Sequence, residues 1–251
     1  MKNMRAVLTV SFSLLVLVLT YILIHNSNYL WFVGQFQEIP EKFWLHRVNS
    51  PLKMKEFIEK YRGFEMDVIY DEKTGTFNNS HDAEDGFVFL KDTLAQYKSN
   101  KGIWFDIKNL TKANSLNAET CLSKLIADSG VSKKDAIVES HCLPCLNIFA
   151  SKGWKTAYYI VNEGEALSLQ SQENLKNQLS MAQNSGCDYL SMDGHVYNFI
   201  KQNDLLKNKK YLVWYYWEPW YKVNNRKKYR GPVNDQNVEI VLVKDRGRYH
   251  R

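Results

Sequence analysis

The sequence predicts an α/β fold, a (β/α)₈ TIM barrel preceded by one N-terminal transmembrane helix. Eight short apolar or aromatic runs recur along the chain, and helical patterns fill most of the gaps between them; together they predict the barrel. One uncharged apolar segment near the N-terminus predicts the membrane helix. Of the 251 residues, 45% are hydrophobic, 14% are aromatic and only 4 are Cys. This composition excludes a disordered chain and a disulfide-rich miniprotein.

Residues 6–24 form the predicted membrane helix. They carry no charge, and a helix of this length spans about 30 Å, close to the thickness of one hydrocarbon core. Lys2 and Arg5 precede the segment, and the next basic residue is Lys42. The positive-inside rule therefore predicts a cytoplasmic N-terminus and an extracytoplasmic domain at the cell membrane. A cleaved signal peptide is the alternative, although its apolar core is usually shorter, about 7–15 residues.

The chain divides into three predicted parts. Residues 1–25 are a cytoplasmic stub and transmembrane anchor, residues 26–40 are a juxtamembrane linker, and residues 41–251 are the barrel domain. The net charge of +6 is mild for this length and does not indicate a nucleic-acid partner. The membrane, reached through the N-terminal helix, is the first predicted partner.

The eight apolar runs are expected to be the barrel strands. They cover residues 43–49, 63–70, 102–109, 136–142, 155–161, 187–194, 210–218 and 238–245. Ser50 followed by Pro51 predicts the start of the first helix, and Gly63 predicts its end. Further helices are expected at residues 87–98, 117–129, 164–185 and 195–208. An open, doubly wound sheet is the alternative to the closed barrel.

Ionisable side chains gather where the first three strands end, which is where a barrel of this kind places its catalytic groups. They are His46, Arg47, Glu65, Asp67, His81, Asp106 and Lys108. Glu65 and Asp67 share one face of a strand because they are two residues apart. Three carboxylates at one barrel mouth repel one another unless a cation neutralises them, and oxygen ligands suit Mg²⁺ or Ca²⁺. Surface salt bridges, with Lys108 pairing Asp106, are the alternative.

This ordered set resembles the glycerophosphodiester phosphodiesterase superfamily. The resemblance is carried by His46-Arg47, Glu65-x-Asp67, His81-Asp82 and Asp106-x-Lys108. The short path between the second and third strands, together with His46-x-Val48-Asn49 and Tyr216-Trp217, is more similar to the sphingomyelinase D and menorin-like branch. The resemblance covers residues 43–110 and weakens towards the C-terminus. Asp106 departs from the Glu of many relatives, and Val48-Asn49-Ser50 departs from their glycine-containing triplet.

The resemblance implies a PLC-like phosphodiesterase barrel that cleaves a glycerophosphodiester or a related phospholipid-like phosphodiester. It implies three groups of residues: metal ligands Glu65, Asp67 and Asp106 for one divalent cation, Mg²⁺ or Ca²⁺; an acid–base pair, His46 and His81; and substrate-binding Arg47, Lys108 and Trp217. The chemistry is consistent, because fixed positive charge stabilises a phosphoryl transition state and two imidazoles transfer protons near neutral pH. The expected ligand is a phosphodiester small molecule or a lipid headgroup.

Two other functions remain open. A non-catalytic, membrane-anchored barrel would bind a phosphorylated glycan or lipid, and a metal-free phospholipase C would need the histidines without the carboxylates. Glu139 and His141 are expected either to line the mouth, where Glu139 would add to the metal ligands, or to lie behind it or in solvent. Arg226, Lys227 and Lys228 are expected in a loop on the catalytic face that either holds an anionic substrate or is simply solvated. Cys142 and Cys145 favour a structural disulfide or buried thiols, since no redox or zinc context accompanies them.

Overall fold

The computed structural model describes residues 13–21, 39–81, 88–98, 100–161, 169–203, 209–221 and 226–245. For residues 169–170, 216–218 and 226–227 the description covers the backbone alone.

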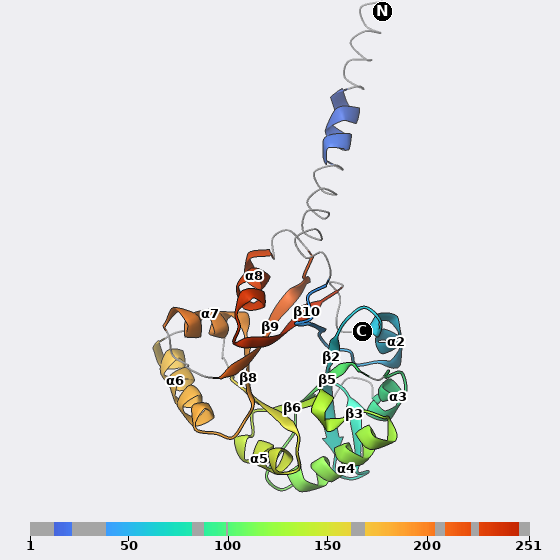
Figure 1. Cartoon of the computed structure of the whole chain (residues 1–251), viewed down its shortest axis with the longest axis vertical. Helices are drawn as coiled ribbons and strands as arrows, with labels where there is room; N and C mark the ends of the chain where they lie inside the picture. Colours follow the sequence, from blue (N-terminus) through green and yellow to red (C-terminus); the bar gives the residue numbers. More distant parts are fainter. Residues whose placement is uncertain are drawn as a thin grey trace, which may run out of the picture.

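Eight parallel strands close into a barrel, which Figure 1 shows ringed by helices. The strands are β1 (Phe43–Leu45), β2 (Gly63–Asp71), β5 (Gly102–Ile107), β6 (Ala136–Ser140), β7 (Lys155–Tyr159), β8 (Tyr189–Asp193), β9 (Lys210–Pro219) and β10 (Val238–Lys244). They pair in that order, and the ring closes because β1 pairs with both β10 and β2. The predicted barrel and its eight strands are confirmed, and the open-sheet alternative is wrong.

The helices lie outside this ring. They are α2 (Pro51–Phe57), α3 (Leu90–Leu94), α4 (Ser115–Asp128), α5 (Leu143–Ser151), α6 (Leu169–Gln183), α7 (Gly194–Gln202) and α8 (Arg226–Asn234), with a 3₁₀ turn η1 (Lys133–Asp135). α2 begins where predicted, because the Ser50 side chain accepts a hydrogen bond from the Lys53 amide and Pro51 opens the first turn. It ends well before Gly63, which instead begins β2.

Some elements differ from the sequence prediction. The segment that begins at Arg226 is helix α8, not a catalytic-face loop. Helix α5 was not predicted, and its first turn carries a disulfide between Cys142 and Cys145. Two short strands, β3 (Thr76–Asn79) and β4 (Val88–Phe89), extend β2 in antiparallel fashion. Strands of this length are too short to display an alternating pattern.

The predicted membrane helix lies partly outside the described residues. Of residues 6–24, the structure describes 13–21, and these are helical. Among the residues described, no helix combines the length and the apolar character that a bilayer crossing requires.

Inside the ring, apolar side chains fill the amino-terminal half and support the site above. The Trp44 indole lies against Gly63 and Gly102, where a Cβ atom on either glycine would overlap it. Trp44 also packs against an apolar layer made of Trp104, Ile137, Ala157, Leu212, Trp214, Ile240 and Leu242. The tight approach to Trp44 is therefore the reason that both strands begin with glycine.

Candidate functional site

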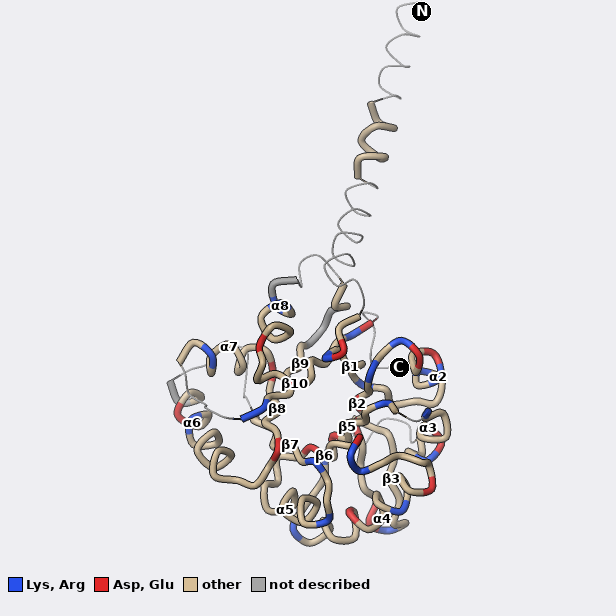
Figure 2. The backbone as a smooth tube through the Cα atoms, viewed as in Figure 1, with Lys and Arg blue, Asp and Glu red and all other residues tan. Residues whose placement is uncertain are grey.

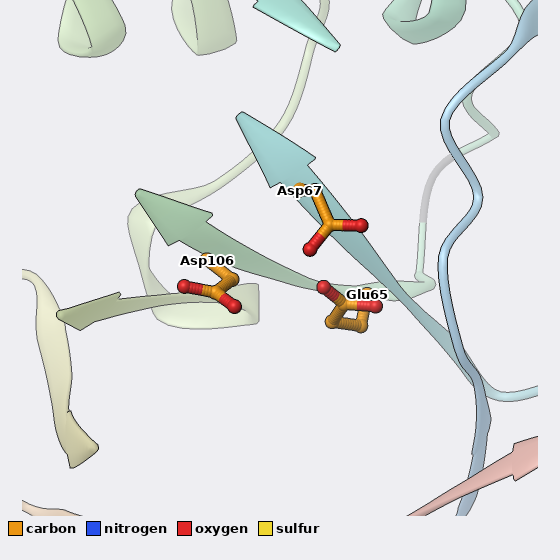
Figure 3. A group of neighbouring side chains, drawn as sticks. All are labelled: Glu65, Asp67 and Asp106. Atoms are coloured by element: carbon orange, nitrogen blue, oxygen red, sulfur yellow. The ribbon is translucent and has the colours of Figure 1, made fainter. Parts of the chain in front are cut away.

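Three carboxylates from two neighbouring strands converge above this apolar layer. Glu65 and Asp67 lie on β2, and Asp106 lies on β5 in direct register with Asp67. One carboxylate oxygen from each residue lies within 4.8 Å of the other two. Figure 3 shows the three side chains turned toward one another. We call Glu65, Asp67 and Asp106 the carboxylate cluster; the structure brings them together as the sequence predicts.

The three carboxylates of the cluster differ in how burial and neighbouring charges shift their pKa values. Burial, then the charges of Asp67 and Asp106, raise the pKa of Glu65 well above its usual range. Burial also acts to raise the pKa of Asp67, yet Lys108 and Arg47 outweigh it and hold that pKa below its ordinary value. Burial raises the pKa of Asp106 too, against the attraction of Lys108. A divalent cation fits this set, because buried carboxylates that repel one another are ligands in need of positive charge.

The two basic side chains expected to bind phosphate already contact the cluster. The Lys108 ammonium lies 2.7 Å from Asp67 Oδ1 and also pairs with Asp106. The Arg47 Nε atom lies 3.6 Å from Asp67 Oδ2, while the Arg47 amide donates to Glu65 Oε2 at 2.6 Å. Figure 2 shows acidic and basic positions gathered where β2, β5 and β6 lie side by side. The salt-bridge alternative is right about the Lys108–Asp106 pair, but Glu65 and Asp67 are buried and not on the surface.

His46 follows β1 and faces the carboxylate cluster. Its Nε2 atom lies 3.6 Å from Glu65 Oε2, and its Nδ1 atom has no hydrogen-bond partner among the described residues. Burial lowers the pKa of His46 well below its usual value, and the nearby charges of Lys244 and Arg47 act in the same direction. The ring is therefore neutral near pH 7 and has a lone pair with which to accept a proton.

His81 reaches the site from the segment that follows β3. The Ser80 amide donates to the Asp67 carbonyl at 3.2 Å, which ties this segment to β2. His81 lines the same cavity as His46 and the carboxylate cluster, and it acts on the pKa of Asp106. The structure thus places both predicted histidines at one cavity.

An unusual backbone turn carries Arg47, and Lys53 supports it. Arg47 has a φ of 57°, a left-handed conformation that is uncommon for residues other than glycine. The Lys53 ammonium donates to the carbonyl oxygens of His46 and Arg47, at 3.1 and 2.7 Å. This helix side chain therefore holds the turn that aims the Arg47 amide at Glu65. Sequence reasoning missed Lys53, because nothing in the pattern of α2 marks one lysine among several.

Asn49, to which the sequence analysis assigned no role in the site, fixes Asp67 in place. Its Nδ2 atom donates to Asp67 Oδ2 at 2.8 Å, and its Oδ1 atom accepts from the Asp67 amide at 2.9 Å. The side chain thus orients a predicted metal ligand through two hydrogen bonds. Its place three residues after His46, in the segment that follows β1, is the signal that was available.

These groups surround a cavity of about 130 Å³. It is lined by His46, Arg47, Glu65, Asp67, His81, Trp104, Asp106, Ile107, Lys108, Glu139, His141, Tyr159, Trp214 and Leu242. Since a water molecule needs about 10–15 Å³ by this measure, the cavity has room for an ion and a small polar group. Glu139 and His141 both belong to the lining, as one of the two sequence interpretations held.

The predicted roles of four other residues remain untested. Trp217 lies on β9, but its side chain is outside the described residues. The side chains of Arg226 and Lys227 are also outside them, and Lys228 is exposed on α8. The roles proposed for these residues therefore stay predictions.

Comparisons with known proteins identify the fold. No family profile matches the sequence, and no curated protein matches it. Structurally the chain is similar to a glycerophosphodiester phosphodiesterase from Parabacteroides distasonis, with 16% identity, a TM-score of 0.56, and coverage of 82% of this chain and 93% of that chain. An Oleispira antarctica phosphodiesterase, solved with the product sn-glycerol-3-phosphate, shows 12% identity, a TM-score of 0.55, and coverage of 81% and 92%.

A glycerophosphodiester phosphodiesterase from Agrobacterium tumefaciens shows 10% identity, a TM-score of 0.52, and coverage of 81% of this chain and 96% of that chain. Likeness at this level of identity concerns the fold. The chain has the barrel fold of these phosphodiesterases, as the sequence predicts. The sphingomyelinase D and menorin-like branch stays a prediction.

Proposed function

We propose that this chain is a membrane-anchored, metal-dependent phosphodiesterase that cleaves a glycerophosphodiester or a related phospholipid-like phosphodiester. The observation that carries the proposal is the buried carboxylate cluster, which shares one cavity with His46 and His81. The fold supports it, because solved structures with the same fold include glycerophosphodiester phosphodiesterases. One phosphodiesterase of this fold is bound to its product sn-glycerol-3-phosphate.

The carboxylate cluster would hold one divalent cation, Mg²⁺ or Ca²⁺, because both ions prefer carboxylate oxygens. When bound, the cation neutralises charge on the phosphoryl group during cleavage. Arg47 and Lys108 lie beside the cluster and bind the remaining phosphate oxygens. Their contacts with Asp67 hold them in position before the substrate arrives, so little reorganisation is needed.

The two histidines transfer the protons. His46 accepts the proton of the attacking hydroxyl at a ring nitrogen, because burial and neighbouring cations keep it neutral. His81 donates a proton to the oxygen of the leaving alcohol. Whether the hydroxyl belongs to water or to the substrate itself, the same two transfers balance the reaction.

Phosphorus NMR on the full-length protein in detergent tests this function. A panel of glycerophosphodiesters and sphingophospholipids is incubated with Mg²⁺, with Ca²⁺ or with EDTA. We expect a phosphomonoester or cyclic phosphate only when a divalent ion is present, and no product from the Asp106→Asn variant. Glu239→Gln is the matched control, since Glu239 is an exposed carboxylate at the far end of the barrel.

The same experiment decides between the alternatives. Turnover that is insensitive to EDTA would favour a metal-free phospholipase C. Binding of a phosphorylated glycan or lipid without turnover of any diester would favour the non-catalytic barrel.

The proposal includes the location of the domain. Residues 6–24 tether the barrel to the cell membrane, with the N-terminus in the cytoplasm and the barrel outside it. Protease added to intact cells should then degrade the barrel. Protection until the membrane is broken would contradict this orientation.

A further inference from the structure

Cys142 and Cys145 lie at the start of helix α5, between two parallel strands of the barrel. They form a disulfide, and Pro144 stands between them in the first turn of the helix. β6 precedes this turn, β7 follows the helix, and the two strands pair in parallel. A Cys-x-x-Cys pair that opens the helix of such a β–α–β unit is the arrangement in which dithiols undergo reversible oxidation. The sequence pattern alone favours a structural disulfide or buried thiols, and the folded unit adds a redox context.

A purely structural role explains this disulfide poorly. The constraint that a disulfide places on the unfolded chain grows with the length of the loop that it closes. The two cysteines are only 3 positions apart in the sequence, so this bond constrains the unfolded chain little. The turn is also held by its backbone, because the amides of Cys145 and Leu146 both donate to the Cys142 carbonyl, at 2.9 and 3.1 Å. We therefore expect the fold to persist when the disulfide is reduced.

The two sulfur atoms differ in what can reach them and in what stabilises their thiolates. Cys145 is 0% exposed, whereas Cys142 is half-buried, so an incoming thiolate reaches the Cys142 sulfur first. Cys142 is the N-cap residue of α5, and its side chain makes no capping hydrogen bond in the disulfide. Once reduced, the Cys142 sulfur can accept from the first-turn amides, as N-cap side chains do. The positive end of the helix then stabilises its thiolate.

We infer that Cys142 and Cys145 are a redox-active pair that exchanges its disulfide with thiols, either one dithiol or two monothiols. A thiolate attacks Cys142 Sγ, the bond to Cys145 breaks, and Cys145 leaves as a thiolate that takes up a proton. A second thiolate attacks the reductant's sulfur in this mixed disulfide, which releases Cys142 and leaves the two reductant sulfurs joined. Two electrons thus pass to the pair. This activity does not rest on the proposed function, although His141, which precedes Cys142, lines the cavity of the candidate site.

Equilibration with glutathione tests the inference on the full-length protein in detergent. The protein is incubated in mixtures of reduced and oxidised glutathione, quenched with acid and alkylated, and mass spectrometry measures the reduced fraction of the pair. We expect the pair to pass from oxidised to reduced within the range of mixtures, because redox-active pairs are poised near the glutathione pool and structural disulfides resist it. A pair that stays oxidised in every mixture overturns the inference.

The reduced protein provides a second test, with Cys121 as the internal control. Cys121 is also half-buried, but it lies within α4, and burial raises the pKa of its thiol. At pH 7 we expect iodoacetamide to alkylate Cys142 at least about tenfold faster than Cys121, since a helix N-terminus stabilises the thiolate. Peptide mass spectrometry at short reaction times measures both rates in one sample. An equal or slower rate at Cys142 would overturn its assignment as the reactive sulfur.

Two single variants distinguish the attacked sulfur from the buried one. With oxidised glutathione, Cys145→Ser should keep a mixed disulfide at Cys142, because no second sulfur displaces the glutathione. Cys142→Ser should form at most about a tenth as much adduct at Cys145, since the exchange rate depends on access. Cys121→Ser is the control, and its pair should titrate with glutathione as in the wild type. Equal adducts in the two variants contradict the inference; if Cys145→Ser does not fold by circular dichroism, the wild-type titration still decides.

Discussion

The two ends of the barrel are built from the same strands but differ in what they bury: one end buries apolar side chains and the other buries charged ones. At the amino-terminal end, Trp44 fills the space left by Gly63 and Gly102. A few residues further along these strands stand His46 and the carboxylate cluster. The amino-terminal end also has the larger hollow, about 380 Å³ against 130 Å³ at the mouth.

The difference teaches that burial of charge, and not the size of a hollow, distinguishes the candidate site from the other end of the barrel. The larger hollow is lined by solvated charges such as those of Arg62 and Lys155, which are exposed. At the mouth, Glu65 and Asp67 are buried and their pKa values are displaced in opposite directions. Buried ionisable groups reduce stability and are retained where chemistry requires them. We therefore expect changes at the mouth to alter activity and changes at the other end to alter folding.

The largest expected effect is at the mouth. His46→Ala and His81→Ala should each lower the rate of phosphodiester cleavage by about 10²–10⁴-fold, because each removes one proton transfer. Steady-state kinetics measures this, and unfolding midpoints should change little. His195→Ala is the control, since His195 is exposed on α7. Retention of the wild-type rate in both variants would contradict the roles of His46 and His81 as an acid–base pair.

The next effect is at the opposite end. Gly102→Ala should lower the free energy of unfolding by about 1–3 kcal/mol, because its Cβ would overlap the Trp44 indole. Urea denaturation measures this, and metal affinity per folded molecule should be unchanged. Gly186→Ala has open space around its Cβ and provides the control. Equal losses in the two variants would mean that Trp44 does not fill this end tightly.

A smaller effect tests how the mouth is positioned. Asn49→Ala should weaken binding of the divalent cation by about ten- to a hundredfold, because Asp67 loses both hydrogen bonds that orient it. Calorimetric titration with Mg²⁺ or Ca²⁺ measures this, with the exposed Asn184→Ala as control. An unchanged affinity would show that Asp67 is held by Lys108 and Arg47 without help.

The smallest effect concerns pH. Burial is the main cause that lowers the pKa of Lys53 to about 7, while an unfolded lysine titrates near 10.5. Between these values the unfolded chain binds more protons, so Lys53 makes stability rise with pH across that window. The difference in unfolding free energy, wild type minus Lys53→Met, should increase by at least about 1 kcal/mol from pH 7 to pH 10. Urea titrations in EDTA at both pH values measure it; a constant difference would contradict the low pKa.

The sequence pattern predicted the repeating strands of the barrel and the charged residues of the carboxylate cluster. The eight strands could be predicted because short apolar runs alternate with helical patterns. The cluster could be predicted because charged residues inside apolar runs are rare. The pattern did not find β3 and β4, which are too short to alternate, or the partners of Asp67 and Arg47. Asn49 and Lys53 act through hydrogen bonds that only the folded turn creates, so no periodicity reveals them.

The shortest strand of the ring, β1, is also the strand where the ring is held together by the fewest backbone pairings on one side. β1 has three residues, and it meets β2 through one register pair, Leu45 with Phe64, and one further backbone bond from Val48 to Glu65. β2 and β5, in contrast, share six register pairs. When thermal motion parts the ring, we expect it to part first beside β1. His46 would then move away while Asp67 and Asp106 stay together, so a divalent cation bound as we propose would stay in place while the proposed base is displaced.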